Sequence, residues 1–171
     1  KRLIRSDGAQ RDDALIQIGP IAIEGTALLA SDADSRLSAA GLSDGELIAA
    51  RELLRNPGIS VLRAATAARA QPGLHALHDP TEGGLATAAL ELAEAAGLSV
   101  ELHSGAILRH PLTDRVSAAL DLDPLGLLAS GALLAAVEPQ HVPAMLRQLD
   151  NVGVRAAQIG SLRASNRPAI L

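Results

Sequence analysis

The segment HDPTEGG, at positions 78–84, carries the side chains best suited to chemistry in this sequence. It places two carboxylates, a hydroxyl and two consecutive glycines directly before an apolar stretch with helical periodicity. Asp79 is expected to cap that helix, with Pro80 at its first position and Glu82 completing a capping box. This arrangement does not explain the glycines, because each weakens a first helical turn by about 0.5–1 kcal/mol relative to alanine.

Two explanations of Gly83 and Gly84 stay open at this point. They allow another backbone to pack very close, or they admit a ligand to exposed amides at the carboxyl edge of a sheet. Because the carboxylates of Asp79 and Glu82 repel a bare phosphate, an anion would arrive with a cation or would contact Thr81 and the backbone amides. The ligand hypothesis therefore selects four binding residues in the loop: Asp79, Thr81, Gly83 and Gly84.

Other polar side chains give no metal or catalytic pattern. His75 and His78 are three residues apart on a short predicted strand, so they face opposite sides and form no metal pair. Asp32 and Asp34 resemble the start of a calcium loop, but Leu37 occupies the position that requires glycine. No metal site is predicted, and chain order alone assigns no catalytic residue.

Composition excludes several classes of function. The chain of 171 residues contains no Phe, Tyr or Trp, so bases cannot stack on aromatic side chains. A net charge of −4 and an isoelectric point near 5.7 disfavour binding to a phosphate backbone. The absence of cysteine excludes disulfides, thiolate zinc sites and a cysteine nucleophile. We therefore expect no nucleic-acid partner.

The sequence also lacks a segment suited to a bilayer. Its longest uncharged run, Pro124–Val137, has 14 residues and is too short to span a membrane. We expect a cytoplasmic protein without a membrane partner. The chain starts without Met and stops in a segment, at positions 167–171, that reads as a strand. These features indicate a piece of a longer protein.

Hydrophobic periodicity predicts a single α/β domain over residues 1–171, with helices packed on a sheet. A capping box at Ser43 and Glu46 marks one helix start, and residues 30–41 read as a flexible loop. The strand, helix and strand over residues 73–102 form a β-α-β unit, and such units are normally parallel and right-handed. Strands are predicted at 14–23, 73–77, 98–102, 132–137 and 154–160, and helices at 44–55, 59–70, 85–96, 111–122 and 142–153.

Three separated segments carry a family resemblance. They read NPGISVLRAA, GLHALHDPTEGGLATAALELAEAAGLSVEL and LDPLGLLASGALLAAV, in that order along the chain. Together they resemble the C-terminal domain of the aminoimidazole-ribonucleotide (AIR) synthetase superfamily, the PurM-like proteins, over residues 14–160. The nearest branch is that of HypE-like hydrogenase expression/formation proteins. Their loop usually reads DPTRGG, so that Glu82 replaces a basic residue and removes a natural phosphate partner.

The resemblance implies an N-terminal ATP-binding and dimerising domain, with the active site in the cleft between the two domains. Members of the family use ATP with Mg²⁺ to activate an amide-like or other oxygen by phosphoryl transfer, and the hydrogenase factor dehydrates a carbamoylated cysteine at its own C-terminus. Asp79, Thr81, Gly83 and Gly84 would face the cleft. Ser130 and Gly131, in ASGALL, match a second family loop and add two cleft candidates.

The resemblance also sets expectations for cofactors and partners. ATP and Mg²⁺ would bind the full-length protein, whereas this chain alone would hold no cofactor and be inactive. Expected partners are the missing N-terminal domain, a second copy of the full-length protein and a maturation protein. The alternatives are a thiamine-phosphate kinase or selenophosphate synthetase branch, or a non-catalytic binding or assembly module.

Overall fold

The computed structural model describes residues 3–164 and is built around one five-stranded sheet. The strand order is β2-β4-β1-β5-β3, and every neighbouring pair is antiparallel. In the centre, Ile16 lies opposite Ala135 on one side and Gln158 on the other. The strands are β1 (Ala14–Ile18), β2 (Leu74–His78), β3 (Leu98–Leu102), β4 (Leu133–Val137) and β5 (Ala156–Ala164).

The predicted β-α-β unit is present in an unusual position. Strand β2 is followed by helix α5 (Gly84–Ala95) and then by β3. The two strands run in the same direction, because four antiparallel pairings separate them, but they form opposite edges of the sheet. Sequence patterns predicted both strands and could not predict this order, because β1, β4 and β5 insert between them from distant parts of the chain.

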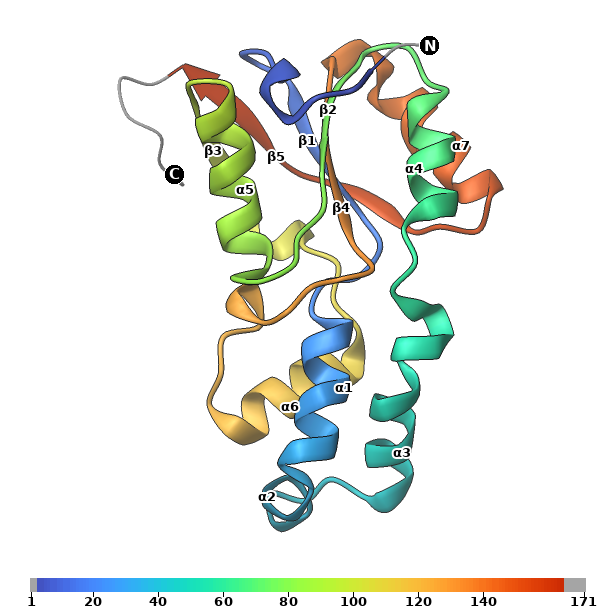
Figure 1. Ribbon diagram of the computed structural model, residues 1–171, viewed down its shortest axis with the longest axis vertical. Coiled ribbons are helices and arrows are strands. Elements are labelled where there is room, and N and C mark those ends of the chain that lie inside the picture. The colour runs from blue at the N-terminus through green and yellow to red at the C-terminus, as the bar shows by residue number, and fades with distance from the viewer. Residues whose placement is uncertain (1–2, 165–171) are drawn as a thin grey trace.

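Each face of the sheet is covered by helices (Figure 1). Helix α5 packs on one face, where its buried Leu85 and Leu92 share a core with Leu15 of β1. Helices α4 (Leu62–Arg69) and α7 (Val142–Asn151) pack on the other face, against a core that includes Ile16. Consecutive residues of a strand point to opposite faces, and both faces of β1 are covered, so all five of its residues are buried. Four of them are apolar, and the side chain of the fifth, Gln17, hydrogen-bonds to the backbone of Leu108.

A helical lobe extends from one end of the sheet (Figure 1). It consists of α1 (Ile23–Asp32), α2 (Asp34–Ala39), α3 (Asp44–Glu52) and α6 (Pro111–Leu120). The lobe has its own apolar cluster, formed by Ala30, Leu37, Leu42, Leu47, Ala50 and Val116. The prediction of a flexible loop over residues 30–41 is therefore wrong, because burial of Leu37 outweighs the weak helix propensity of this polar segment.

Most other predicted elements are confirmed to within a few residues. Helix α3 starts at the expected capping box, in which the Ser43 hydroxyl accepts from the Glu46 N–H and the Glu46 carboxylate accepts from the Ser43 N–H. The strand predicted at residues 167–171 lies outside the described residues. Among the described residues, no helix is long and apolar enough to cross a membrane. Short helical turns span Ser6–Gly8, Leu54–Gly58, Ser104–Ala106, Pro124–Gly126 and Pro139–His141.

Candidate ligand-binding site

The loop at residues 79–84 lies between β2 and α5 and differs from the expected helix start. Helix α5 begins at Gly84 and its N-cap is Gly83, which makes no side-chain cap. The predicted capping box of Asp79 and Glu82 is therefore wrong, and both residues are exposed, as is Thr81. The cause is a left-handed backbone at Gly83 (φ 76°) and Gly84 (φ 65°), which turns the chain before the helix can form.

The two glycines have different surroundings. A Cβ atom at Gly84 would lie 2.3 Å from the carbonyl oxygen of Leu125 and 2.7 Å from that of Leu127. Gly84 is buried against this passing backbone, so close packing accounts for it. Gly83 is exposed, and the contact that a Cβ would make there is with Thr87 of the same helix. Only Gly83 is thus open to a molecule approaching from solvent.

The two groups of predicted cleft residues adjoin each other. The Ala129 N–H donates to the carbonyl oxygen of Thr81 at 3.3 Å, which ties the 79–84 loop to the segment before β4. Ser130 is half-buried in that segment. Gly131 follows it and lines a cavity, whereas the other predicted residues do not. The structure therefore brings both loops to the same end of the sheet, where β2 ends and β4 begins, without placing them in one pocket.

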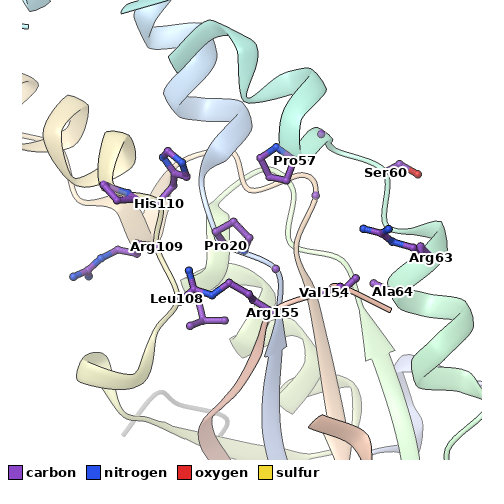
Figure 2. Close-up of a pocket in the computed structure, with 15 residues that line it drawn as sticks. Pro20, Pro57, Ser60, Arg63, Ala64, Leu108, Arg109, His110, Val154 and Arg155 are labelled. Atoms are coloured by element: carbon purple, nitrogen blue, oxygen red, sulfur yellow. The ribbon is translucent and has the colours of Figure 1, made fainter. Parts of the chain in front are cut away.

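That cavity measures about 330 Å³ and lies where β1 ends and β4 and β5 begin (Figure 2). Its walls come from five separate segments of the chain, and many of the lining residues are glycine or proline. The segments are residues 19–20, parts of 57–64, residues 108–111, Gly131 and residues 153–155.

The charged side chains at this cavity are all basic. They are Arg63 from α4, Arg109 before α6 and Arg155 before β5, and no carboxylate lines the cavity. The Nε atom of Arg109 is paired with the Asp114 carboxylate at 2.7 Å. The side chains of Arg63 and Arg155 make no ion pair or hydrogen bond within residues 3–164. Two cationic groups are thus uncompensated in a chain with a net charge of −4.

His110 completes one wall of the cavity. Its Nδ1 atom accepts from the Leu112 N–H at 3.2 Å and so caps helix α6. Burial lowers the pKa of His110 from its usual value. A neutral ring that accepts at Nδ1 carries its proton on Nε2, so this residue can donate one hydrogen bond without adding a charge.

The comparisons with known proteins decide the family. The family described as AIR synthase related protein, C-terminal domain, matches residues 10–171. The chain belongs to this family.

Relatives in the AIR synthase related family are consistent with this assignment. Carbamoyl dehydratase HypE of Cupriavidus necator is 30% identical over 173 residues, which cover 96% of this chain and 44% of that protein. A crystal structure of Escherichia coli HypE superposes with a TM-score of 0.80 at 25% identity, over 98% of this chain and 48% of that one. A HypE solved in complex with ATP shares the fold, with a TM-score of 0.68 at 23% identity over 95% and 46%. The chain spans about half the length of the proteins it matches.

Membership in the AIR synthase related family confirms the expected α/β fold of the PurM C-terminal type. The arginine-lined cavity was not predicted. Its sequence signal is weak, because it consists of three breaks at Gly19–Pro20, Pro57–Gly58 and His110–Pro111 that only the folded chain brings together. Arg63 and Arg155 read as ordinary surface residues in the sequence, since the segments that carry them, residues 57–64 and 153–155, are distant along the chain and meet only in the folded protein.

Proposed function

We propose that this chain is the C-terminal domain of an ATP-dependent, HypE-like enzyme of the AIR synthase related family. It would act as a single domain, residues 1–171, and provide one wall of a cleft for nucleotide and substrate. A separate ATP-binding domain would supply the other wall. The observation that carries the proposal is the 30% identity to a carbamoyl dehydratase HypE across 96% of the chain.

The exposed side of the 79–84 loop suits a nucleotide that carries its own cation. Asp79, Thr81 and Glu82 are exposed there, and the loop contains no basic side chain. Within residues 3–164, no group of three or more acidic or histidine side chains could hold a metal ion. Magnesium commonly binds through one or two carboxylates together with substrate phosphates. Asp79 would therefore fit as a single ligand of a nucleotide-bound Mg²⁺.

The chain's own residues would bind and orient in this reaction. ATP with Mg²⁺, when bound, supplies the phosphoryl group that activates an oxygen of the substrate. The Thr81 hydroxyl could donate to a phosphate, and exposed Gly83 leaves room for the phosphates beside the backbone. Ser130 and Gly131 would border the same cleft through the contact between Thr81 and Ala129. Such chemistry depends mainly on positioning and charge neutralisation.

The proposal extends to the setting of the full-length protein. It would work in the cytoplasm as a homodimer, with a maturation protein as partner and without nucleic acid or membrane. This chain by itself would hold no ATP and would not turn it over.

The test compares the chain alone with the chain supplied with the part of Cupriavidus necator HypE that lies outside the matched region. Phosphate release from ATP should be absent for the chain alone and should appear in the combined protein. Asp79→Asn should lower kcat at least tenfold, and Glu94→Gln, at an exposed position of α5, serves as the matched control. Rapid turnover by the isolated chain would contradict the proposal.

A non-catalytic assembly role has one observation in its favour, which is the packing of Gly84 against residues 125–127. In that case Asp79→Asn would leave turnover unchanged. Thiamine monophosphate and selenide, offered as substrates to the combined protein, would distinguish the thiamine-phosphate kinase and selenophosphate synthetase branches.

A further inference from the structure

The chain leaves β2 at His78 and reaches Asp79, the candidate contact to a nucleotide-bound cation, one residue later. Asp79 is exposed, whereas His78 before it is half-buried and Pro80 after it is buried. The direction in which the Asp79 carboxylate points therefore depends on how the end of β2 is held.

Backbone contacts hold the far end of the loop. The Thr81 carbonyl oxygen accepts from the Gly84 N–H at 3.2 Å and from the Ala129 N–H at 3.3 Å. Gly84 itself is buried against the backbone of residues 125–127. All of these contacts come after Asp79 in the chain, so the position of Asp79 is left to the near end of the loop.

The near end of the loop belongs to an edge strand. Strand β2 is the first in the sheet order, so its ladder is formed with β4 alone and finishes with the pairing of His78 and Leu134. Beside this last pair, the Ser6 hydroxyl donates to the Leu77 carbonyl oxygen over 3.4 Å, which is long for a hydrogen bond. Fraying ends are among the parts of a fold that open most easily. A further contact at His78 thus restricts Asp79 more than it would beside a central strand.

A side-chain hydrogen bond provides that contact. The Nε2 atom of His78 lies 2.9 Å from Oε2 of Glu91, about two turns into α5. An ionised carboxylate only accepts, so His78 donates from Nε2. The His78 side chain is 23% exposed and that of Glu91 is 54% exposed, so the bond is partly shielded from water. It joins the strand before the loop to the helix after it (Figure 1), and thereby fixes the end of β2 relative to α5.

We propose that His78 is a positioning residue of this site, which acts through its hydrogen bond to Glu91 to keep the Asp79 carboxylate directed toward the cation of a bound nucleotide. This inference rests on the function proposed above for the 79–84 loop. Its role differs from that of Asp79, because the Nε2 atom of His78 is engaged by Glu91 and not by the nucleotide.

Such a role affects binding of the nucleotide and not the transfer of its phosphoryl group. Without the bond, Asp79 would hold the productive direction for a smaller fraction of the time, and the apparent affinity for the magnesium nucleotide would fall by that fraction. A partly exposed charged pair contributes a factor of about three to five to such an equilibrium. The KM for MgATP should therefore rise about three- to fivefold, with kcat nearly unchanged.

The first test measures the loop itself in the 171-residue chain, through backbone amide order parameters from NMR relaxation. The Asp79 amide of the parent chain should have a value near that of rigid backbone, about 0.85. His78→Ala should lower it toward about 0.6, whereas the Gly84 amide should change little, because the far end of the loop keeps its contacts. An unchanged value at Asp79 would overturn the proposal, whether or not the loop binds ATP.

Two conservative substitutions separate the hydrogen bond from the bulk of the side chain. His78→Gln places an amide N–H at about the reach of Nε2, so it should keep the order parameter and the KM close to those of the parent chain. His78→Asn carries the same amide on a shorter side chain that ends near the position of Nδ1, so it should behave like His78→Ala. If His78→Gln and His78→Asn gave equal losses, the hydrogen bond would not be the cause.

The second test uses turnover of MgATP by the combined protein defined above. His78→Ala and Glu91→Ala should each raise the KM about three- to fivefold, and the double variant should raise it no further, because both changes remove the same bond. Glu94→Ala, at an exposed position of α5, is the matched control. Single effects that multiply in the double variant, or an equal rise with Glu94→Ala, would contradict the proposal.

The outcomes separate this inference from the proposed function on which it rests. If Asp79→Asn leaves turnover unchanged, the function proposed for the loop fails, and the role of His78 at a nucleotide site fails with it. If Asp79→Asn lowers kcat but His78→Ala leaves the KM unchanged, the loop still serves the nucleotide and only the positioning role of His78 is wrong.

Discussion

At the scale of single residues, Gly83 and Gly84 show how neighbouring glycines can serve different purposes. Both have left-handed backbone, yet only Gly84 lies under the passing backbone of residues 125–127. The sequence indicated that the pair needs an explanation, because two glycines disfavour a helix start. It could not choose between packing and ligand contact, because the packing partner lies about forty residues further along the chain.

Gly84→Ala should destabilise the fold strongly. The new Cβ atom would need more space than the carbonyl oxygens of Leu125 and Leu127 leave, and alanine also disfavours a φ of 65°. We expect a loss of about 3 kcal/mol or more in the free energy of unfolding, measured by urea denaturation.

Gly97→Ala is the control for that change. Gly97 has a similar φ of 67°, but a Cβ there meets nothing within 4 Å. The free energy of unfolding should therefore fall only by the cost of placing alanine in a left-handed backbone conformation, about 1–2 kcal/mol. Equal losses for the two variants would mean that contact with residues 125–127 contributes nothing.

The pH dependence of stability should carry a contribution from His110. Burial lowers the pKa of this histidine in the folded state, while the unfolded chain titrates near the usual value of about 6.5. The unfolded state therefore binds the proton more readily. The contribution of neutral His110 to the free energy of unfolding is therefore fully present above about pH 6.5. It is lost as the pH falls toward the pKa that His110 has in the folded state.

His110→Asn should flatten that part of the profile. Asparagine keeps a helix-capping acceptor for the Leu112 N–H and does not titrate. Unfolding free energies measured between pH 7.5 and 5.5 should fall less for the variant than for the parent chain. A profile unchanged by the substitution would assign the dependence to other groups.

At the scale of elements, local patterns were sufficient for most helices and strands and insufficient for their arrangement. The capping box at Ser43 and the end of α5 before Gly97 follow from neighbouring residues alone. The strand order and the helices within residues 30–41 depend on contacts between distant segments. One such contact is from the Arg51 guanidinium, which donates to the Ala30 carbonyl oxygen at 2.8 Å and is paired with Asp34.

Ser43→Ala should weaken helix α3 at its start. The substitution removes the hydroxyl that accepts from the Glu46 N–H at 3.3 Å and donates to the Glu46 carboxylate at 2.8 Å. A loss of about 1 kcal/mol is expected in urea denaturation, as for other serine caps. Ser43→Asn, which retains a capping acceptor, should recover most of the loss, and failure to do so would show that the cap is not the cause.

At the scale of the whole molecule, the sheet and the helical lobe have separate apolar clusters. The lobe cluster around Leu37 and Leu47 is smaller than the clusters on the two faces of the sheet. Smaller apolar burial gives a lower free energy of opening. The lobe should therefore open without the sheet. Its junction with the sheet borders the arginine-lined cavity, since Pro57, His110 and Pro111 belong to the lobe side and Gly131 and Arg155 to the strand side.

Native-state hydrogen exchange can separate lobe opening from global unfolding. Leu134 is fully buried in β4, so Leu134→Ala should cost about 2–5 kcal/mol and accelerate exchange of β1 and β4 amides about 30-fold or more. The cost applies equally to the native state and to a state with only the lobe open, because the sheet is intact in both. Amides of α3 should therefore exchange at their original rates.

In contrast, Leu47→Ala destabilises only states with a folded lobe, so it should accelerate exchange in α3 and in the sheet alike. Acceleration of α3 amides by Leu134→Ala to the same extent as β4 amides would show that lobe and sheet unfold as one unit.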